Sequence, residues 1–169
     1  MSGAAGDSRV RAMVDDHFAR IWSLLRRLGV PSEALDDAAQ QVFIVAARRA
    51  VEIEVGRERP YLQGVAVRVA SEQRRSAARR DARRPPEDAA PPQPDELLDR
   101  KRARELLDDV LDAMPFDLRA AFVLFELDEL TVPEIAQLLD VPEGTAASRL
   151  RRAREDFRSR VAELKKVIK

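Results

Sequence analysis

The stretch "TVPEIAQLLDVPEGTAASRLRRAR", residues 131–154, contains two helical patterns separated by a short turn. Thr131 and Glu134, three residues apart, form a capping-box sequence that predicts the start of the first helix. The proline after Val141 predicts the start of the second helix. Ala136 is small enough for the second helix to cross close to it, and Val141 is placed to fill the angle between the helices. This arrangement is typical of a helix-turn-helix.

The expected second helix has an apolar face and a basic face. Its apolar residues recur at helical spacing and are expected to pack inward: Ala146, Leu150, Ala153 and Phe157. The opposite face presents Ser148, Arg151 and Arg152. Arginine in the major groove can bind guanine O6 and N7 through two hydrogen bonds, so we expect this face to read DNA. Residues around it are expected to contact phosphates, namely Gly144, Thr145, Arg149 and Arg154.

Charge is distributed unevenly along a chain that is neutral overall. The 169 residues include 30 Lys and Arg and 30 Asp and Glu. Residues 143–169 carry nine basic and four acidic residues, whereas residues 117–142 carry one basic and six acidic residues. A basic helix is often only a solvated face, but the helix-turn pattern before it favours DNA binding.

The composition excludes several kinds of site. There is no cysteine, which excludes disulfides and cysteine-ligated metal sites. Because His17 is the single histidine, we expect neither a histidine metal cluster nor a histidine-dependent catalytic triad. No apolar run approaches the roughly 18–20 residues that span a bilayer, and the N-terminus lacks a signal-peptide pattern. Few aromatic residues and few glycines argue against a β-sandwich. We expect an all-α cytoplasmic protein with no metal, no cofactor, no small-molecule substrate, no membrane insertion and no enzymatic activity.

Apolar periodicity predicts helices on both sides of a proline-rich segment. Ahead of it, stripes run from Val14 to Leu28, from Leu35 to Ala47 and from Leu62 to Val69, with Ser32 expected as the N-cap of the second helix. Residues 85–95 hold five of the ten prolines and no apolar residue larger than alanine, which predicts an extended linker. The expected domains are therefore residues 10–84 and 96–169.

Two segments resemble the extracytoplasmic-function (ECF, group 4) sigma factors of bacterial RNA polymerase. "MPFDLRAAFVLFELDELTVPEIAQLLDVPEGTAASRLRRARE", residues 114–155, resembles their region 4, and "LDDAAQQVFIVAARR", residues 35–49, resembles their region 2.2. The resemblance implies two small helical domains, a region 2 bundle and a region 4 helix-turn-helix, which direct the polymerase core to promoters. It also implies an anti-sigma partner.

The resemblance further implies separate tasks for the two domains. Region 4 would read the −35 element through the basic helix face. Region 2 would melt the −10 element and hold an extruded base near residues 51–61, where unstacking must be offset by new contacts. The residues implied there are Tyr61, Arg68, Arg74, Arg75, Arg79 and Arg80. The core polymerase, through its clamp and flap, would be bound with the help of Asp36, Asp37, Gln40 and Gln41.

Three positions depart from the family pattern. Tyr61 stands in place of a tryptophan, Arg68 in place of a frequent asparagine, and Asp140 in place of the turn glycine, although aspartate tolerates a left-handed backbone. The basic run from Arg74 to Arg84 can also be a solvated helix end. Two other functions stay open: a stand-alone helix-turn-helix repressor or activator with an N-terminal dimerisation or sensing domain, and a protein-binding adaptor whose affinity is independent of salt.

Overall fold

The computed structural model describes residues 2–81 and 96–167, which form α-helices and one short 3-10 helix but no strand. The N-terminal half contains α1 (Ser2–Arg27), η1 (Ser32–Ala34), α2 (Leu35–Arg48) and α3 (Glu58–Asp81). The C-terminal half contains α4 (Glu96–Asp112), α5 (Phe116–Glu126), α6 (Val132–Leu139) and α7 (Glu143–Val167). The all-α prediction is confirmed. The expected linker, residues 85–95, lies outside the described residues, so the domain limits stay a prediction.

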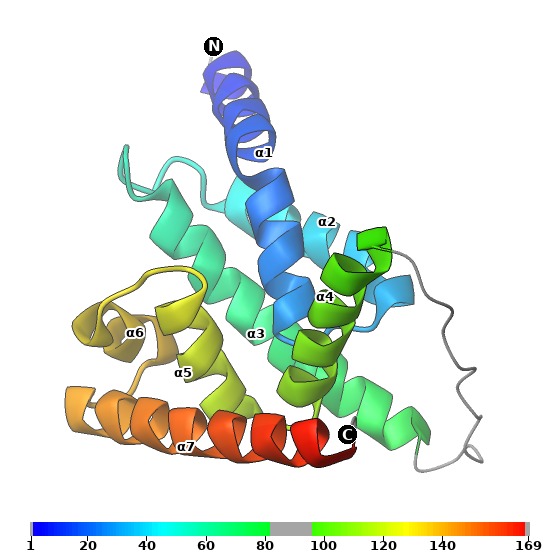
Figure 1. The fold of residues 1–169 in the computed structure, drawn as a ribbon. Coiled ribbons are helices and arrows are strands. Elements are labelled where there is room, and N and C mark those ends of the chain that lie inside the picture. The colour runs from blue at the N-terminus through cyan, green and yellow to red at the C-terminus, as the bar shows by residue number, and fades with distance from the viewer. Residues whose placement is uncertain (1, 82–95, 168–169) are drawn as a thin grey trace.

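Helices α1, α2 and α3 pack against one another around apolar side chains that follow the expected stripes (Figure 1). Those that are fully buried include Ile21, Leu25, Leu28, Val42, Ala46, Leu62 and Val69. Helix α1 ends where expected, because Gly29 adopts a left-handed conformation with φ of +89°. Within residues 2–81 and 96–167, no helix combines the length and the apolar character that crossing a membrane requires.

The predicted N-cap at Ser32 is wrong. Pro31 and Ser32 begin the 3-10 helix, in which the N–H of Ala34 donates to the carbonyl of Pro31 at 2.9 Å. Helix α2 starts only at Leu35, with Ala34 as its N-cap and no side chain capping it. The chain therefore enters α2 through a backbone turn, and Ser32 lies too far upstream to cap it.

Helices α6 and α7 form the predicted helix-turn-helix. The carboxylate of Glu134 accepts hydrogen bonds from the hydroxyl and the N–H of Thr131, both at 2.7 Å, and these bonds lower the pKa of Glu134. Asp140 turns the chain with a φ of 53°, and the N–H of Val141 donates to the carbonyl of Ala136 at 3.0 Å. The second helix then packs inward through Ala146, Leu150, Ala153 and Phe157.

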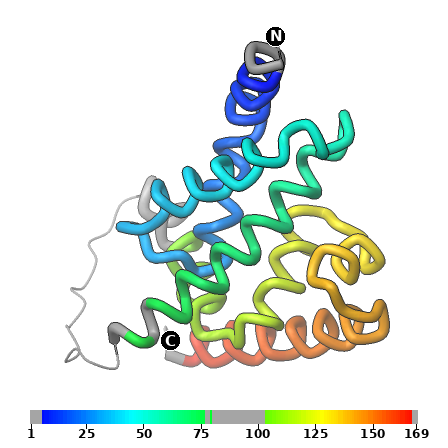
Figure 2. The backbone as a smooth tube through the Cα atoms, turned by 180° about the vertical axis from the view of Figure 1, so that it is seen from behind, coloured from blue at the N-terminus to red at the C-terminus, as the bar shows by residue number. Residues whose placement is uncertain are grey.

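The two halves pack against each other as well as internally. In Figure 2, the view from behind, α3 crosses in front of the C-terminal helices, and the buried apolar residues form one continuous cluster that includes both halves. The approach of α6 to α3 is close at Gly64, where an added Cβ would lie 3.9 Å from Cγ of Leu138. Gly64 thus lies within a helix, and a Cβ added there would make an ordinary van der Waals contact with the other half.

Replacing Gly64 by alanine is expected to raise the free energy of unfolding by about 0.5–1 kcal/mol, because alanine favours the helix and 3.9 Å leaves room for a methyl group. Chemical denaturation followed by circular dichroism measures the change. Gly6→Ala, in α1, is the comparison in which the added Cβ meets nothing within 4 Å. If Gly64→Ala is less stable than the original chain, then α6 can approach α3 this closely only because residue 64 has no side chain.

Candidate nucleic-acid interfaces

The outward face of α7 carries the residues expected to read DNA. Ser148, Arg151 and Arg152 are exposed on the first half of this helix, on the side opposite the buried Leu150. Arg151 forms an ion pair at 3.0 Å with Glu155, one turn further along, in which both side chains are largely exposed. Arg152 forms no ion pair within the described part of the chain, so its guanidinium is free to meet a base edge.

The flanking residues of α7 are less free than the sequence suggested. Arg149 pairs with Asp117 at 3.6 Å, and Arg154 pairs with Glu126 at 2.7 Å while it lies over the ring of Phe125. Both acidic partners belong to α5, so α5 holds these two guanidinium groups beside the recognition face. At the start of α7, Gly144 is exposed, whereas Thr145 is half-buried and its N–H donates to Pro142 at 2.9 Å.

The residues of α3 that were expected to contact DNA do not share one surface. Tyr61 and Arg68 line a cleft, described below, and Arg75 and Arg79 are exposed further along the helix. Arg74 is different, because it donates to the carbonyl of Leu28 at 3.4 Å and lies 5.6 Å from the ring centre of Phe116. Arg74 thus bridges the two halves. The side chain of Arg80 is outside the described residues.

A cleft of about 890 Å³ separates the start of α3 from the α5–α6 loop. We call its arginine side the basic wall, formed by Arg49, Arg57, Arg59 and Arg68. We call the facing side the acidic wall, formed by Asp128, Glu129 and Glu134. Three of the four arginines were missed from the sequence, although Arg57 and Arg59 lie within the 51–61 segment that was expected to lie beside the −10 base, and Arg49 lies just before it.

The exposed face of α2 carries all four residues expected to bind polymerase. Asp37, Gln40 and Gln41 are exposed, and so is Asp36, but Asp36 accepts a hydrogen bond from the indole of Trp22 at 3.0 Å. Asp36 therefore also joins α1 to α2. Exposed apolar side chains on the same two helices extend this surface in a way that the sequence did not reveal, namely Phe18 and Ile44, which are 39% and 45% exposed.

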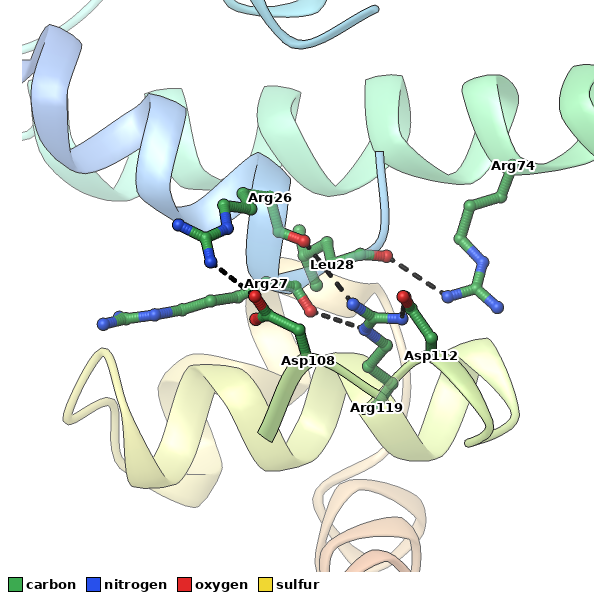
Figure 3. A network of polar contacts seen from close by, with 7 residues as sticks. All are labelled: Arg26, Arg27, Leu28, Arg74, Asp108, Asp112 and Arg119. Atoms are coloured by element: carbon green, nitrogen blue, oxygen red, sulfur yellow. Dashed lines mark hydrogen bonds and ion pairs between the residues drawn. The ribbon is translucent and has the colours of Figure 1, made fainter. Parts of the chain in front are cut away.

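A buried arginine that the sequence analysis missed connects the halves at the end of α1 (Figure 3). Arg119 of α5 is fully buried, and its guanidinium donates to the carbonyls of Arg26 and Arg27 and to the carboxylate of Asp112. Burial lowers the pKa of Arg119, and the hydrogen bond that Arg119 donates to Asp112 opposes that change. The signal in the sequence was a single charge inside the apolar run "LRAAFVLF", residues 118–125.

Comparison with known proteins agrees with this geometry. Residues 104–157 match the family model described as Sigma-70, region 4. The ECF RNA polymerase sigma factor SigE of Mycolicibacterium smegmatis is 28% identical over 155 residues, which cover 89% of this chain and 60% of that relative. The ECF RNA polymerase sigma-E factor of Escherichia coli K12 is 39% identical over 71 residues, 42% of this chain and 37% of the relative. Residues 104–157 thus match sigma-70 region 4, and the chain as a whole is similar to ECF sigma factors.

Two solved structures have the same fold as this chain. CnrH in complex with the cytosolic domain of CnrY superposes with a TM-score of 0.70 at 19% identity, over 95% of this chain and 94% of CnrH. RpoE in complex with the anti-sigma factor NepR from Bartonella quintana also gives 0.70, at 17% identity, over 90% and 96% of the two chains. The chain spans about three fifths of the Mycolicibacterium relative's length.

Proposed function

We propose that this chain directs the core RNA polymerase to specific promoters in the cytoplasm, as a dissociable subunit that catalyses no reaction itself. The proposal rests on the outward face of α7, where Arg151 and Arg152 are exposed on a helix-turn-helix within the segment that matches sigma-70 region 4. This face is proposed to read the −35 element. Gly144, Arg149 and Arg154 are proposed to contact the phosphates beside it.

The N-terminal half, residues 10–84, is proposed to bind the polymerase and the −10 element, and residues 85–95 to link it to residues 96–169. Asp37, Gln40 and Gln41 are proposed to contact the clamp, because they are exposed on one side of α2. The C-terminal half is proposed to contact the flap. Tyr61 and Arg68 are proposed to meet the opened −10 strand, and Arg75 and Arg79 to extend the phosphate track.

An anti-sigma factor is proposed as a regulatory partner. The resemblance to ECF sigma factors implies one, and RpoE, a protein of the same fold, was solved in complex with the anti-sigma factor NepR. CnrH, also of this fold, was solved with the cytosolic domain of CnrY. Co-purification with the product of a neighbouring gene, followed by loss of transcription on its addition, tests this part of the proposal.

Run-off transcription with core polymerase on genomic fragments tests the main proposal. We expect discrete transcripts that need both the core enzyme and this chain, and no footprint when the chain is alone on duplex DNA. A stand-alone repressor would instead footprint an inverted repeat without polymerase. That result, together with no transcripts, would contradict the proposal.

Replacing Arg152 by alanine is expected to weaken recognition of the −35 element by roughly 1–3 kcal/mol, because a guanidinium bound to guanine loses two hydrogen bonds. Binding of the reconstituted holoenzyme to a promoter and to a copy with a scrambled −35 element measures the effect. Arg158→Ala is the matched control, since Arg158 is an exposed arginine further along the same helix. Equal losses of affinity on both DNAs would show that Arg152 contacts phosphate and not a base.

Replacing Asp37 by alanine is expected to weaken binding to core polymerase about tenfold, the loss of one charged interface contact worth about 1.4 kcal/mol. Fluorescence anisotropy with a dye-labelled chain and purified core enzyme measures the dissociation constant. Asp109→Ala, which removes an exposed carboxylate from α4, serves as the control. If both variants bind core polymerase as tightly as the original chain, Asp37 lies outside the interface.

A further inference from the structure

The cleft between the halves has opposite charges on its two sides. The basic wall comes from the end of α2, the following loop and the start of α3, whereas the acidic wall comes from the α5–α6 loop and the first turn of α6. The charges of Arg59 and Arg57 contribute to the lowered pKa of Glu134, after the larger contribution of its bonds to Thr131. The two walls therefore attract each other across the cleft.

Direct hydrogen bonds join the two walls at Asp128. The amide of Gln63 on α3 donates to the carboxylate of Asp128 at 2.7 Å, and both side chains are almost fully buried. The guanidinium of Arg59 donates to the backbone carbonyl of Asp128 at 2.9 Å. Further into the interface, Leu138 lies against Gly64. The loop of the C-terminal half is thus seated on the α3 surface at which the −10 strand is proposed to bind.

The loop that carries Asp128 has an unusual backbone. Glu129 adopts a left-handed conformation with φ of 60°, which is unfavourable for a residue with a side chain. The turn is held by backbone bonds from the N–H groups of Asp128 and Leu130 to the carbonyls of Val123 and Leu124, at 3.1 and 2.9 Å. This conformation directs Asp128 toward Gln63 while Glu129 stays exposed along the cleft.

We propose that the acidic wall is an autoinhibitory segment, which occupies the basic wall in place of single-stranded DNA and keeps the free chain closed. The carboxylates of the acidic wall face the arginines across the cleft and would repel the backbone phosphates that those arginines attract, so the closed arrangement and a bound strand exclude each other. The inference rests on the proposed function, because it names the regulation of the −10 surface. It also adds Arg49, Arg57 and Arg59 to the residues that bind the strand.

The contact is suited to opening. A buried carboxylate that is bonded to a neutral amide has lost much of its hydration, and opening restores that hydration. In the closed arrangement the face of α7 around Arg152 and the face of α2 around Asp37 are both exposed. Polymerase can therefore dock on α2 before the cleft opens, and the −10 surface becomes available only afterwards.

An open variant, Asp128→Ala with Glu129→Gln, tests the inference on the full chain. Anisotropy of a fluorescein-labelled single-stranded oligothymidine gives the dissociation constant without polymerase. We expect binding about tenfold tighter than that of the original chain. This is the change produced when the fraction of chains in the open, binding-competent form rises from about one tenth to nearly all. Asp109→Asn with Glu163→Gln removes the same charge from exposed sites on α4 and α7, and it should change affinity less than twofold.

A locked variant, Gly64→Cys with Leu138→Cys, tests the opposite direction. A Cβ at residue 64 lies 3.9 Å from Cγ of Leu138, which puts the two side chains in contact, and the chain has no cysteine of its own to form other disulfides. We expect the oxidised chain to lose most of its affinity for the oligothymidine and to regain that affinity on reduction. Repeating the titration in an Arg152→Ala chain removes the contribution of Arg152 on α7.

Equal dissociation constants for the original, open and oxidised locked chains would overturn the inference. Run-off transcription by the original chain with core polymerase is measured in parallel, and the oxidised locked chain should support less of it. If the original chain gives transcripts while the three constants agree, the proposed function stands and only the autoinhibition fails. If the original chain gives no transcripts, the proposed function itself fails.

Discussion

Replacing Arg119 by alanine is expected to lower the free energy of unfolding by about 3 kcal/mol. The guanidinium is fully buried and caps the last carbonyls of α1 from the opposite half of the molecule (Figure 3). Its removal deprives the carbonyl of Arg27 of its side-chain donor and opens a cavity, whereas the carbonyl of Arg26 still accepts from the N–H of Gly29 at 2.9 Å. The ion pair with Asp112 contributes less, because the Asp112 side chain is 63% exposed and its charge is screened by water.

Urea unfolding followed by circular dichroism measures this loss. Arg119→Lys keeps the charge but cannot reach several acceptors at once, so it should recover only part of the stability. Arg20→Ala, on the exposed side of α1, is the matched control and should change the free energy of unfolding by less than about 0.5 kcal/mol. A loss below about 1 kcal/mol in Arg119→Ala would mean that water replaces the guanidinium without cost.

Replacing Gly29 by alanine is expected to cost about 3 kcal/mol, through two separate effects. Gly29 has a φ of +89°, which disfavours any side chain. A Cβ there would also lie 2.6 Å from Nη1 of Arg119 and 2.6 Å from Nη1 of Arg74, well inside the contact distance. Because Arg119 is enclosed on all sides, it cannot move aside without losing its bonds to α1.

Gly56→Ala separates the two effects. Gly56 has a φ of +86°, but a Cβ there meets nothing within 4 Å, so this variant reports backbone strain alone. We expect it to cost about 1 kcal/mol. The cost of Gly29→Ala should also fall by about 1 kcal/mol when Arg119 is already alanine, because the two residues are coupled. Equal costs for Gly29→Ala and Gly56→Ala would show that the guanidinium groups adapt freely.

Local sequence signals predicted the helix-turn-helix well. The capping box at Thr131, the turn at Asp140 and the inward Leu150 all follow from residues within one or two turns of one another. The outward direction of Arg151 and Arg152 is then a consequence of helical periodicity. The start of α2 was missed because Pro31 favoured a 3-10 turn over the side-chain cap expected from Ser32.

Contacts between the halves could not be predicted in this way. Gln63 and Asp128 are 65 residues apart, and Arg119 is 92 residues from Arg27, so no periodic pattern relates the partners. Arg74 was assigned to a phosphate track because it lies in a basic run, yet its side chain lies between α3 and α5. For the same reason the basic wall was recognised only in part, through Arg68.

Because of its hydrogen bond to Asp36, Trp22 is an intrinsic fluorescent probe of the packing between α1 and α2. Trp22 is the one tryptophan in the sequence, and its half-buried indole lies where α1 meets α2. Ultraviolet emission therefore registers the melting of the N-terminal half alone, whereas circular dichroism registers every helix. Midpoints that coincide in the original chain and separate in Arg119→Ala would reveal, without any attached dye, that the buried guanidinium makes the two halves unfold as one.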